Sequence, residues 1–360
     1  MKLREDKEFY KAFAVMTIVM ALQNLIVFGV NLADSVMLGS YSELALDGSA
    51  VCNQIQFLLQ MVATGISNGM VVMCSQYWGK REIKPIHRIF AVSLWLGIII
   101  SLLMTAAAAV IPLSVVKLFT DDAQIAAAAV EYISIIKYTY LIFTVTVILT
   151  SVLRSAETVR IGFYVSLSSL VINIFLNYVL IYGKLGFPEL GIKGAAIATL
   201  ISRVTELIVT LIYVFAIDKK LKLRFEAFIK VEGRYIKDFI KTGIPLTASS
   251  ISWGIAMSIQ GIIIGRLGGT AISANSIATT IFQVATVVIY ASGSAACVLT
   301  GKSIGENCTI ELIKKRSVNM QIIFLIAGIL SSALLFGFKS VILDYYNTSA
   351  ETRRMTEIFI

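Results

Sequence analysis

Residues 37–41 read MLGSY and residues 263–267 read IIGRL, so a glycine occupies the same place in two apolar stretches that lie 226 residues apart. The correspondence continues along the chain without a gap. It pairs Ala45 with Ala271, Ile55 with Ile281, Val72 with Val298, Gly79 with Gly305 and Glu131 with Glu357. Parallel repeats of one unit are typical of membrane carriers that bind cargo at the interface between the copies. The duplication therefore predicts a membrane protein built from two related lobes.

The composition supports a membrane location. The chain has 360 residues, of which 57% are hydrophobic and only 15% are charged, too little polar surface for an ordinary soluble domain. Long apolar runs predict about nine spanning helices, each near the roughly 20 residues that a bilayer requires. The predicted spans are 11–37, 48–75, 89–113, 127–152, 161–183, 191–217, 240–265, 272–298 and 318–338. The expected fold is an all-α polytopic membrane protein, a two-lobe helical bundle with a parallel pseudo-twofold repeat.

The basic residues give an independent test of this topology. Of the 31 lysines and arginines, 22 fall in alternate segments that begin with the amino terminus, and 7 fall in the intervening loops. Short cytoplasmic loops are the ones enriched in these residues, so the amino terminus is predicted to be cytoplasmic. The net charge of +9 is then explained by topology and by anionic lipid, and it gives no support to nucleic-acid binding.

The longest basic break divides the chain. Residues 1–217 are predicted to form a first six-helix lobe, residues 218–240 a cytoplasmic linker, and residues 241–360 a second lobe. The second copy reaches only three helices and the start of a fourth, so we expect three helices of a twelve-helix plan to be missing. The chain is accordingly interpreted as carboxyl-terminally truncated.

Asp34, near one end of the first span, is the leading candidate for chemistry. A carboxylate inside a membrane helix costs about 2.5–3.5 kcal/mol on insertion scales, which calls for a compensating role. Cation or proton binding would supply that role. The alternative is a side chain that simply reaches the water interface.

Three further polar residues suit a cation site. Asn173 and Asn177 lie four residues apart on one helical face, and Thr199 lies on the next span. Their oxygens could complete a cation shell beside Asp34. They could equally join two helices by hydrogen bonds. Arg203 and Glu206, three residues apart, are expected to neutralise each other along their helix.

Other polar and aromatic residues in the spans are candidates for a cargo cavity. They are Gln23, Gln56, Gln260, Gln283 and Trp253. No constellation for enzyme catalysis occurs, because His87 is the only histidine and no P-loop or dinucleotide fingerprint is present. The four cysteines form no C-x-x-C pair, which predicts neither a disulfide nor a metal site. Without an ATP-binding motif, pumping would need an ion gradient, and the two-lobe repeat favours a carrier over a channel.

Four pieces of the chain resemble the multidrug and toxic compound extrusion (MATE) family. These are NLADSVMLG at 31–39, IN at 172–173 continuing through NYVLIYG at 177–183, GIKGAAIAT at 191–199, and GRLG at 265–268. The resemblance implies twelve helices in two lobes, a V-shaped central cavity and export of organic cations in exchange for H⁺ or Na⁺. It matches Asp34, Asn173, Asn177 and Thr199 to the ion site of the amino-terminal lobe.

Two departures from the family pattern bear on coupling. Many relatives have an acid at the position aligned with Asn177. Relatives also often carry a glutamate where this chain has Ser249 or Ser250. If that alignment holds, coupling depends on Asp34 alone.

The sequence thus predicts a secondary active antiporter that exports organic cations or xenobiotics in exchange for H⁺ or Na⁺ by alternating access. The alternatives are a lipid-linked saccharide flippase of the same architecture and an inactive membrane fragment. We expect no enzyme activity and no cofactor besides the coupling ion. The expected partners are the lipid bilayer and a small organic cation, without nucleic acid. The expected state is a multi-pass monomer in the plasma membrane.

Overall fold

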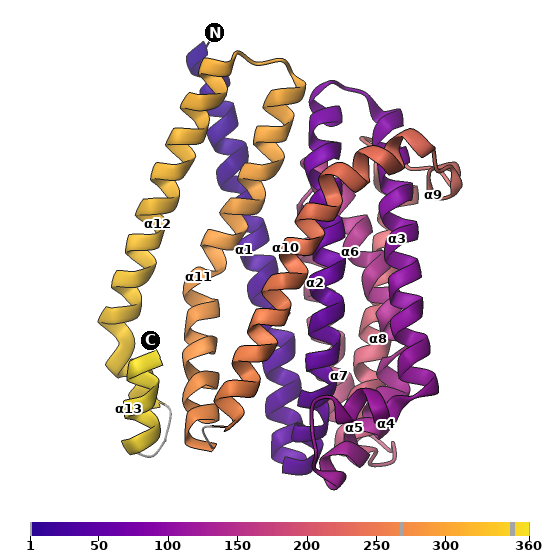
Figure 1. Ribbon diagram of the computed structural model, residues 1–360, viewed down its shortest axis with the longest axis vertical. Helices are drawn as coiled ribbons and strands as arrows, with labels where there is room; N and C mark the ends of the chain where they lie inside the picture. The colour runs from indigo at the N-terminus through magenta and orange to yellow at the C-terminus, as the bar shows by residue number, and fades with distance from the viewer. Residues whose placement is uncertain (1, 267–268, 346–349, 360) are drawn as a thin grey trace.

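The computed structural model describes residues 2–266, 269–345 and 350–359, and these residues form helices without any strand (Figure 1). Leu267 and Gly268 of the quoted GRLG motif lie outside the described residues. Residues 2–217, predicted as the first lobe, contain α1 (Lys2–Tyr41), α2 (Glu43–Gly79), α3 (Ile83–Val110), α4 (Pro112–Lys117), α5 (Ala123–Ile136), α6 (Thr139–Ser155), α7 (Arg160–Ile181), α8 (Gly191–Ile212) and a π-helical end at Tyr213–Ile217. The remainder contains α9 (Glu226–Ile229), α10 (Gly233–Arg266), α11 (Gly269–Gly305), α12 (Ile310–Tyr345) and α13 (Ala350–Phe359).

The described helices agree with a multi-pass membrane protein. Seven of them are long and apolar enough to cross a bilayer, or eight if the bent pair α5–α6 is one span. The remaining predicted span, 240–265, falls on α10, which is helical over that whole range but is not among those seven. Its middle is less apolar because it carries several serines and a threonine.

The fourth predicted span, 127–152, is not one continuous helix. It is broken at Lys137 and Tyr138, where α5 and α6 meet at an angle of 54°. Near the break the amide of Tyr140 donates to the Lys137 carbonyl at 3.3 Å. Thr105 Oγ1 lies 3.2 Å from the same oxygen and 2.8 Å from the Ser101 carbonyl of its own helix, so the two carbonyls share its one proton. The bend therefore has a side-chain partner from α3, which a reading of hydrophobic runs along one helix cannot detect.

The two copies predicted from the sequence share their secondary structure. The bounds of α2 and α11 differ by 226 residues at both ends, and each helix has 37 residues. The following turns also correspond, because Arg81 and Asn307 have φ values of 60° and 55° in the left-handed region that few non-glycine residues adopt. Figure 1 shows α1 and α10 running in the same direction and α2 and α11 in the opposite one, as parallel repeats require.

Small residues let the two lobes approach closely. At Gly65 an added Cβ would lie 2.6 Å from the Thr247 Cα, and at Gly69 it would lie 2.6 Å from the Gly243 Cα. The G-x-x-x-G of α2 therefore packs against α10, so its backbone contact joins one lobe to the other.

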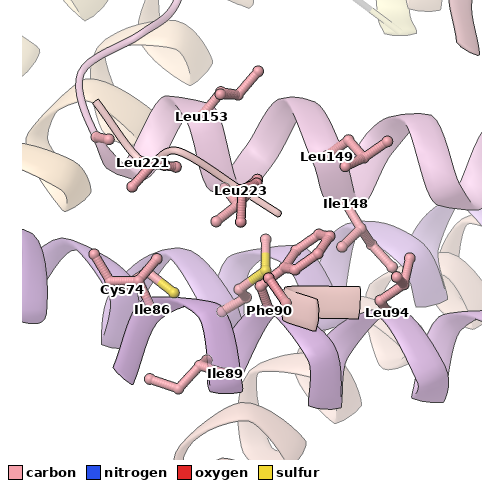
Figure 2. Close-up of a cluster of buried hydrophobic side chains, with 14 of the residues drawn as sticks. Cys74, Ile86, Ile89, Phe90, Leu94, Ile148, Leu149, Leu153, Leu221 and Leu223 are labelled. Carbon is pink, nitrogen blue, oxygen red and sulfur yellow. The ribbon is translucent and has the colours of Figure 1, made fainter. Parts of the chain in front are cut away.

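The end of the bundle that holds the amino terminus, here called the N-face, also holds the α2–α3 turn, α9 and the α11–α12 turn (Figure 1). The segment after Ile217 covers a buried apolar cluster there. Figure 2 shows Leu221 and Leu223 over side chains of α3 and α6, including Phe90 and Leu149. Helix α10 begins at Gly233, inside the stretch predicted as linker up to 240, and Phe239 of this early part packs into the cluster.

Candidate ion site and central cavity

Helices α1, α7 and α8 bring the four predicted ion-site residues together. Asn177 Nδ2 donates to Asp34 Oδ1 and, at 3.2 Å, to Asn173 Oδ1. Asn173 Nδ2 lies 3.5 Å from Thr199 Oγ1. Helix α1 is held in place by the Tyr182 hydroxyl, which donates to the Met37 carbonyl at 2.9 Å. The result is one chain of hydrogen bonds that ends on the carboxylate.

The amide of Asn177 has an orientation that its neighbours determine. Its nitrogen faces two acceptor oxygens, so exchanging the oxygen and nitrogen atoms would set acceptor against acceptor. Asn177 Oδ1 is left buried without a hydrogen-bond partner. Buried polar atoms are normally paired, so this oxygen is a free acceptor for a proton-bearing group or a cation.

A pair of opposite charges lies beside Asp34. Arg203 Nη1 lies 2.9 Å from Glu206 Oε2, and both side chains are largely buried, which confirms the predicted intrahelical pair. Arg203 also lines the small cavity that contains Asp34. When all three side chains are ionised, they together carry a formal charge of −1. One monovalent cation or one proton would therefore neutralise the group.

The space beside Asp34 suits a single small species. The cavity measures about 30 Å³, which is enough for one water molecule or ion. Its wall supplies mainly oxygen-bearing side chains, which are the ligands that hard cations prefer. They include Asn31, Asn53, Gln56, Tyr132, Ser169 and Ser202 in addition to the predicted residues.

A larger cavity of about 660 Å³ lies between the lobes. This volume falls within the range of roughly 300–1,000 Å³ that is usual for small-molecule sites. Helices α1, α2 and α6 line it on one side, and α10 and α11 line it on the other. Gln23 and Trp253, both predicted as cavity residues, lie on its wall.

Equivalent residues of the two copies face this cavity together. With the same spacing of 226 residues, four pairs of its lining residues correspond. The pairs are Gln23 with Ser249, Asn24 with Ser250, Thr64 with Tyr290, and Asn68 with Ser294. A pseudo-twofold relation places equivalent residues around its own axis, so this cavity lies where the two repeats meet.

The other predicted cavity residues lie elsewhere. Gln56 lines the small cavity of Asp34. Gln260 and Gln283 are exposed and line none of the described cavities. Each lies seven residues from a lining residue, Trp253 or Tyr290, and two helical turns amount to about 10 Å along the axis. They therefore lie beyond the cavity, farther from the N-face.

The sequence interpretation missed Arg154. Arg154 falls two residues beyond the predicted span 127–152, but the structure places it in the last turn of α6, on the wall of the central cavity. Sequence alone could not decide this, because the residue lies within two positions of a helix end.

One ion pair at the N-face, Lys302 with Glu157 and here called the latch, joins the lobes. Lys302 Nζ on α11 lies 2.7 Å from Glu157 Oε1, and the same oxygen accepts from Trp78 Nε1 at 3.0 Å. Lys220 Nζ donates to the Ala156 carbonyl at 2.9 Å, and partial burial lowers the pKa of Lys220. A second contact joins α12 to α1, where Asn319 Nδ2 donates to the Tyr10 hydroxyl at 2.6 Å. The lobes are thus closed against each other at this end.

Metal chemistry was not expected from the sequence. In the part of the chain that the structure describes, no three His, Cys, Asp or Glu side chains are grouped so as to hold a metal ion. Cys52, Cys74, Cys297 and Cys308 are all free thiols.

Comparisons with known proteins agree with this architecture. The model of the MatE family matches residues 20–179 and 245–360. The probable multidrug resistance protein NorM of Thermotoga maritima is 29% identical over 240 residues, 65% of this chain and 51% of that protein. NorM of Listeria innocua is 23% identical over 346 residues, 95% of this chain and 75% of that protein. The chain thus spans about half the length of the first relative and three quarters of the second.

A solved structure has the same fold. An outward-facing multidrug resistance MATE family transporter of the MOP superfamily superposes with a TM-score of 0.85. The match covers 97% of this chain and 77% of that one, at 20% identity.

Proposed function

The chain belongs to the MatE family, and on that basis we propose that it is a secondary active exporter that exchanges a small organic molecule for H⁺ or Na⁺. Cargo binds in the central cavity between the lobes. The coupling ion binds at Asp34, and the lobes alternate between an opening at the N-face and an opening at the other end.

The observation that carries this proposal is the charge of the ion site. Asp34, Arg203 and Glu206 leave one negative charge among buried polar groups, and Asn177 Oδ1 offers an unused acceptor. A net buried charge is costly in a membrane unless it is matched. Binding and release of one cation therefore change the free energy of this part of the first lobe, which is what coupling requires.

The central cavity supports a cargo site at the repeat interface. Its aromatic side chains, Trp253 and Tyr290, offer apolar faces for the body of a small organic molecule. The relatives are described as multidrug resistance proteins, which does not favour the lipid-linked saccharide flippase. A monomer in the plasma membrane with a cytoplasmic N-face completes the proposal.

The test is counterflow in proteoliposomes that contain the 360-residue chain, with an imposed H⁺ or Na⁺ gradient. We expect one of these gradients to drive uptake of a fluorescent cargo such as ethidium or a fluorescein derivative. Asp34→Asn should abolish the gradient dependence. Asp47→Asn is the matched control, because Asp47 is an exposed acid that lines neither cavity. If the wild-type chain shows no gradient-driven transport, or if Asp34→Asn transports as the wild type does, the proposal is wrong.

A further inference from the structure

Arg154 is a cation on the wall of the central cavity. It lies there with two neighbours from its own helix, Thr150 and Ser151. A smaller recess of about 30 Å³ adjoins the cavity at this point, and Arg154, Gln23 and Thr158 line it. Arg154 therefore lines both the central cavity and the recess beside it.

The guanidinium group is only partly satisfied. Arg154 Nη2 donates to Ser151 Oγ at 3.3 Å, and Nε is buried without a hydrogen-bond partner. Within the described residues no carboxylate lies within ion-pair distance of it. Arg154 does lie at the carboxyl-terminal end of α6, where the helix dipole favours a positive charge. The interaction with the helix dipole is worth at most about 2 kcal/mol, and it leaves N–H donors of the guanidinium group without acceptors.

The rest of the cavity wall is neutral. Arg154 is the one charged side chain among its described lining residues, and most of the others carry hydroxyl or amide groups. An organic cation in this cavity would meet an uncompensated positive charge in a medium of low dielectric constant, where charges interact strongly. An anionic group would instead find a charged donor, with Gln23 and Thr150 nearby.

We propose that the cargo of the central cavity carries an anionic group, such as a carboxylate, sulfonate or phosphate, that binds to Arg154. Its apolar or aromatic body lies against Trp253 and Tyr290 on the opposite lobe. This assignment rests on the proposed export function and specifies its substrate class. It also places the two ends of one cargo molecule on different lobes, so that occupancy is sensed by both.

The first experiment needs no variant. Equilibrium binding of 2-naphthalenesulfonate and of trimethyl-(2-naphthyl)ammonium, which share one ring system and differ in charge, is measured on the purified chain in uncharged nanodiscs. We expect the anion to bind at least about tenfold more tightly, as one charge-assisted hydrogen bond allows. Equal affinity, or tighter binding of the cation, would overturn the proposal.

Substitutions of Arg154 test whether this residue binds the sulfonate. Arg154→Gln should weaken binding of the sulfonate about tenfold or more and leave binding of the ammonium probe equal or tighter, while Arg154→Lys should keep the preference for the anion. Arg224→Gln, which removes an exposed arginine of the linker, is the matched control and should bind as the wild type does. Unchanged sulfonate binding in a folded Arg154→Gln would overturn the assignment.

Two further results distinguish a cargo anion from a lipid headgroup, and anion binding from transport. If nanodiscs containing phosphatidylglycerol displace the sulfonate from the wild type, the anionic group on Arg154 is a lipid headgroup and the cargo assignment fails. Binding is measured without transport, so an anion preference that depends on Arg154 can persist even if counterflow shows no transport. In that case the export function fails and the binding site stands.

Discussion

At the scale of single residues, the ion site operates through three charges. Asp34 would be an isolated carboxylate if Arg203 were absent, and Arg203 would compensate it fully if Glu206 did not hold the guanidinium group at 2.9 Å. The pair on α8 therefore determines how much negative charge is left for an ion. Glu206 acts through Arg203 and is a positioning residue.

Neutralising Glu206 should weaken ion binding even though Asp34 is untouched. In Glu206→Gln the charges of Asp34 and Arg203 cancel, so a cation gains little on entering. We expect the apparent affinity for the coupling ion to fall about tenfold, equivalent to roughly 1.4 kcal/mol. The measurement is counterflow against ion concentration.

Glu189→Gln is the control for that variant, because Glu189 lies in the loop before α8 and lines no described cavity. An unchanged ion dependence in Glu206→Gln would show that Asp34 does not sense the charge of the α8 pair.

The residues of the ion site could be predicted from the sequence, but the charges around Asp34 could not. Asp34, Asn173, Asn177 and Thr199 are polar residues in apolar spans, and that anomaly is visible in the sequence. That Arg203 approaches Asp34 depends on how α1 and α8 lie against α7, which no periodicity within one helix reports. The functional role of all these residues stays a prediction.

At the scale of helices, the predicted span 127–152 consists of two helices, α5 and α6, that point in different directions. Helix α5 places Tyr132 at the ion cavity, and α6 carries Arg154 to the central cavity. Thr105 on α3 bonds to the carbonyl at the break, so it supports both placements.

Removing that hydroxyl should loosen the bend. Thr105→Val keeps the shape of the side chain and deletes the hydroxyl that the Lys137 and Ser101 carbonyls share, so we expect a loss of about 0.5–1.5 kcal/mol in stability. Thr105→Ser keeps the hydroxyl and should lose less. Thermal unfolding in detergent compares the two variants, and equal midpoints would contradict the role of the hydrogen bond.

The contact between α2 and α10 leaves no room for a side chain at Gly69. A Cβ there would meet the backbone of Gly243 at 2.6 Å, and backbone cannot move aside as a flexible side chain can. We expect Gly69→Ala to destabilise the protein by about 1–3 kcal/mol in thermal unfolding, the usual cost of overpacking.

Gly293→Ala is the matched control for Gly69→Ala. Gly293 lies within α11 with no atom near its added Cβ, so alanine should be neutral or stabilising by up to about 1 kcal/mol. Equal effects of the two substitutions would show that the lobes are not in backbone contact at Gly69.

At the scale of the whole molecule, the duplication explains why one cavity lies between the lobes and why it is lined in pairs. Gly39 and Gly265 revealed the repeat, and the matched bounds of α2 and α11 confirm it. The lining pairs follow from the same spacing, so they could have been predicted once two helices were known to face the axis. The position of Arg154 could not, because adding 226 to 154 gives a number above 360, so no residue of this sequence pairs with it.

The latch is one of the contacts that alternating access must break at the N-face, beside those that join α12 to α1. Lys302→Gln removes the latch, so it should favour opening of the lobes at the N-face. That opening should expose Cys297, a partly buried thiol on the same helix. In a Cys308→Ser background, a membrane-impermeant maleimide added from the N-face side should label Cys297 about two- to fivefold faster, since partly exposed ion pairs contribute at most about 1 kcal/mol. Lys314→Gln removes an exposed lysine of α12 and should leave the rate unchanged.

Glu157→Gln should act like Lys302→Gln, and the double variant should label no faster than either single one, because both remove the same pair. Rates that multiply in the double variant would mean that the two side chains act independently, and the lobes would then be held together at this end by the packing of α2 on α11 instead.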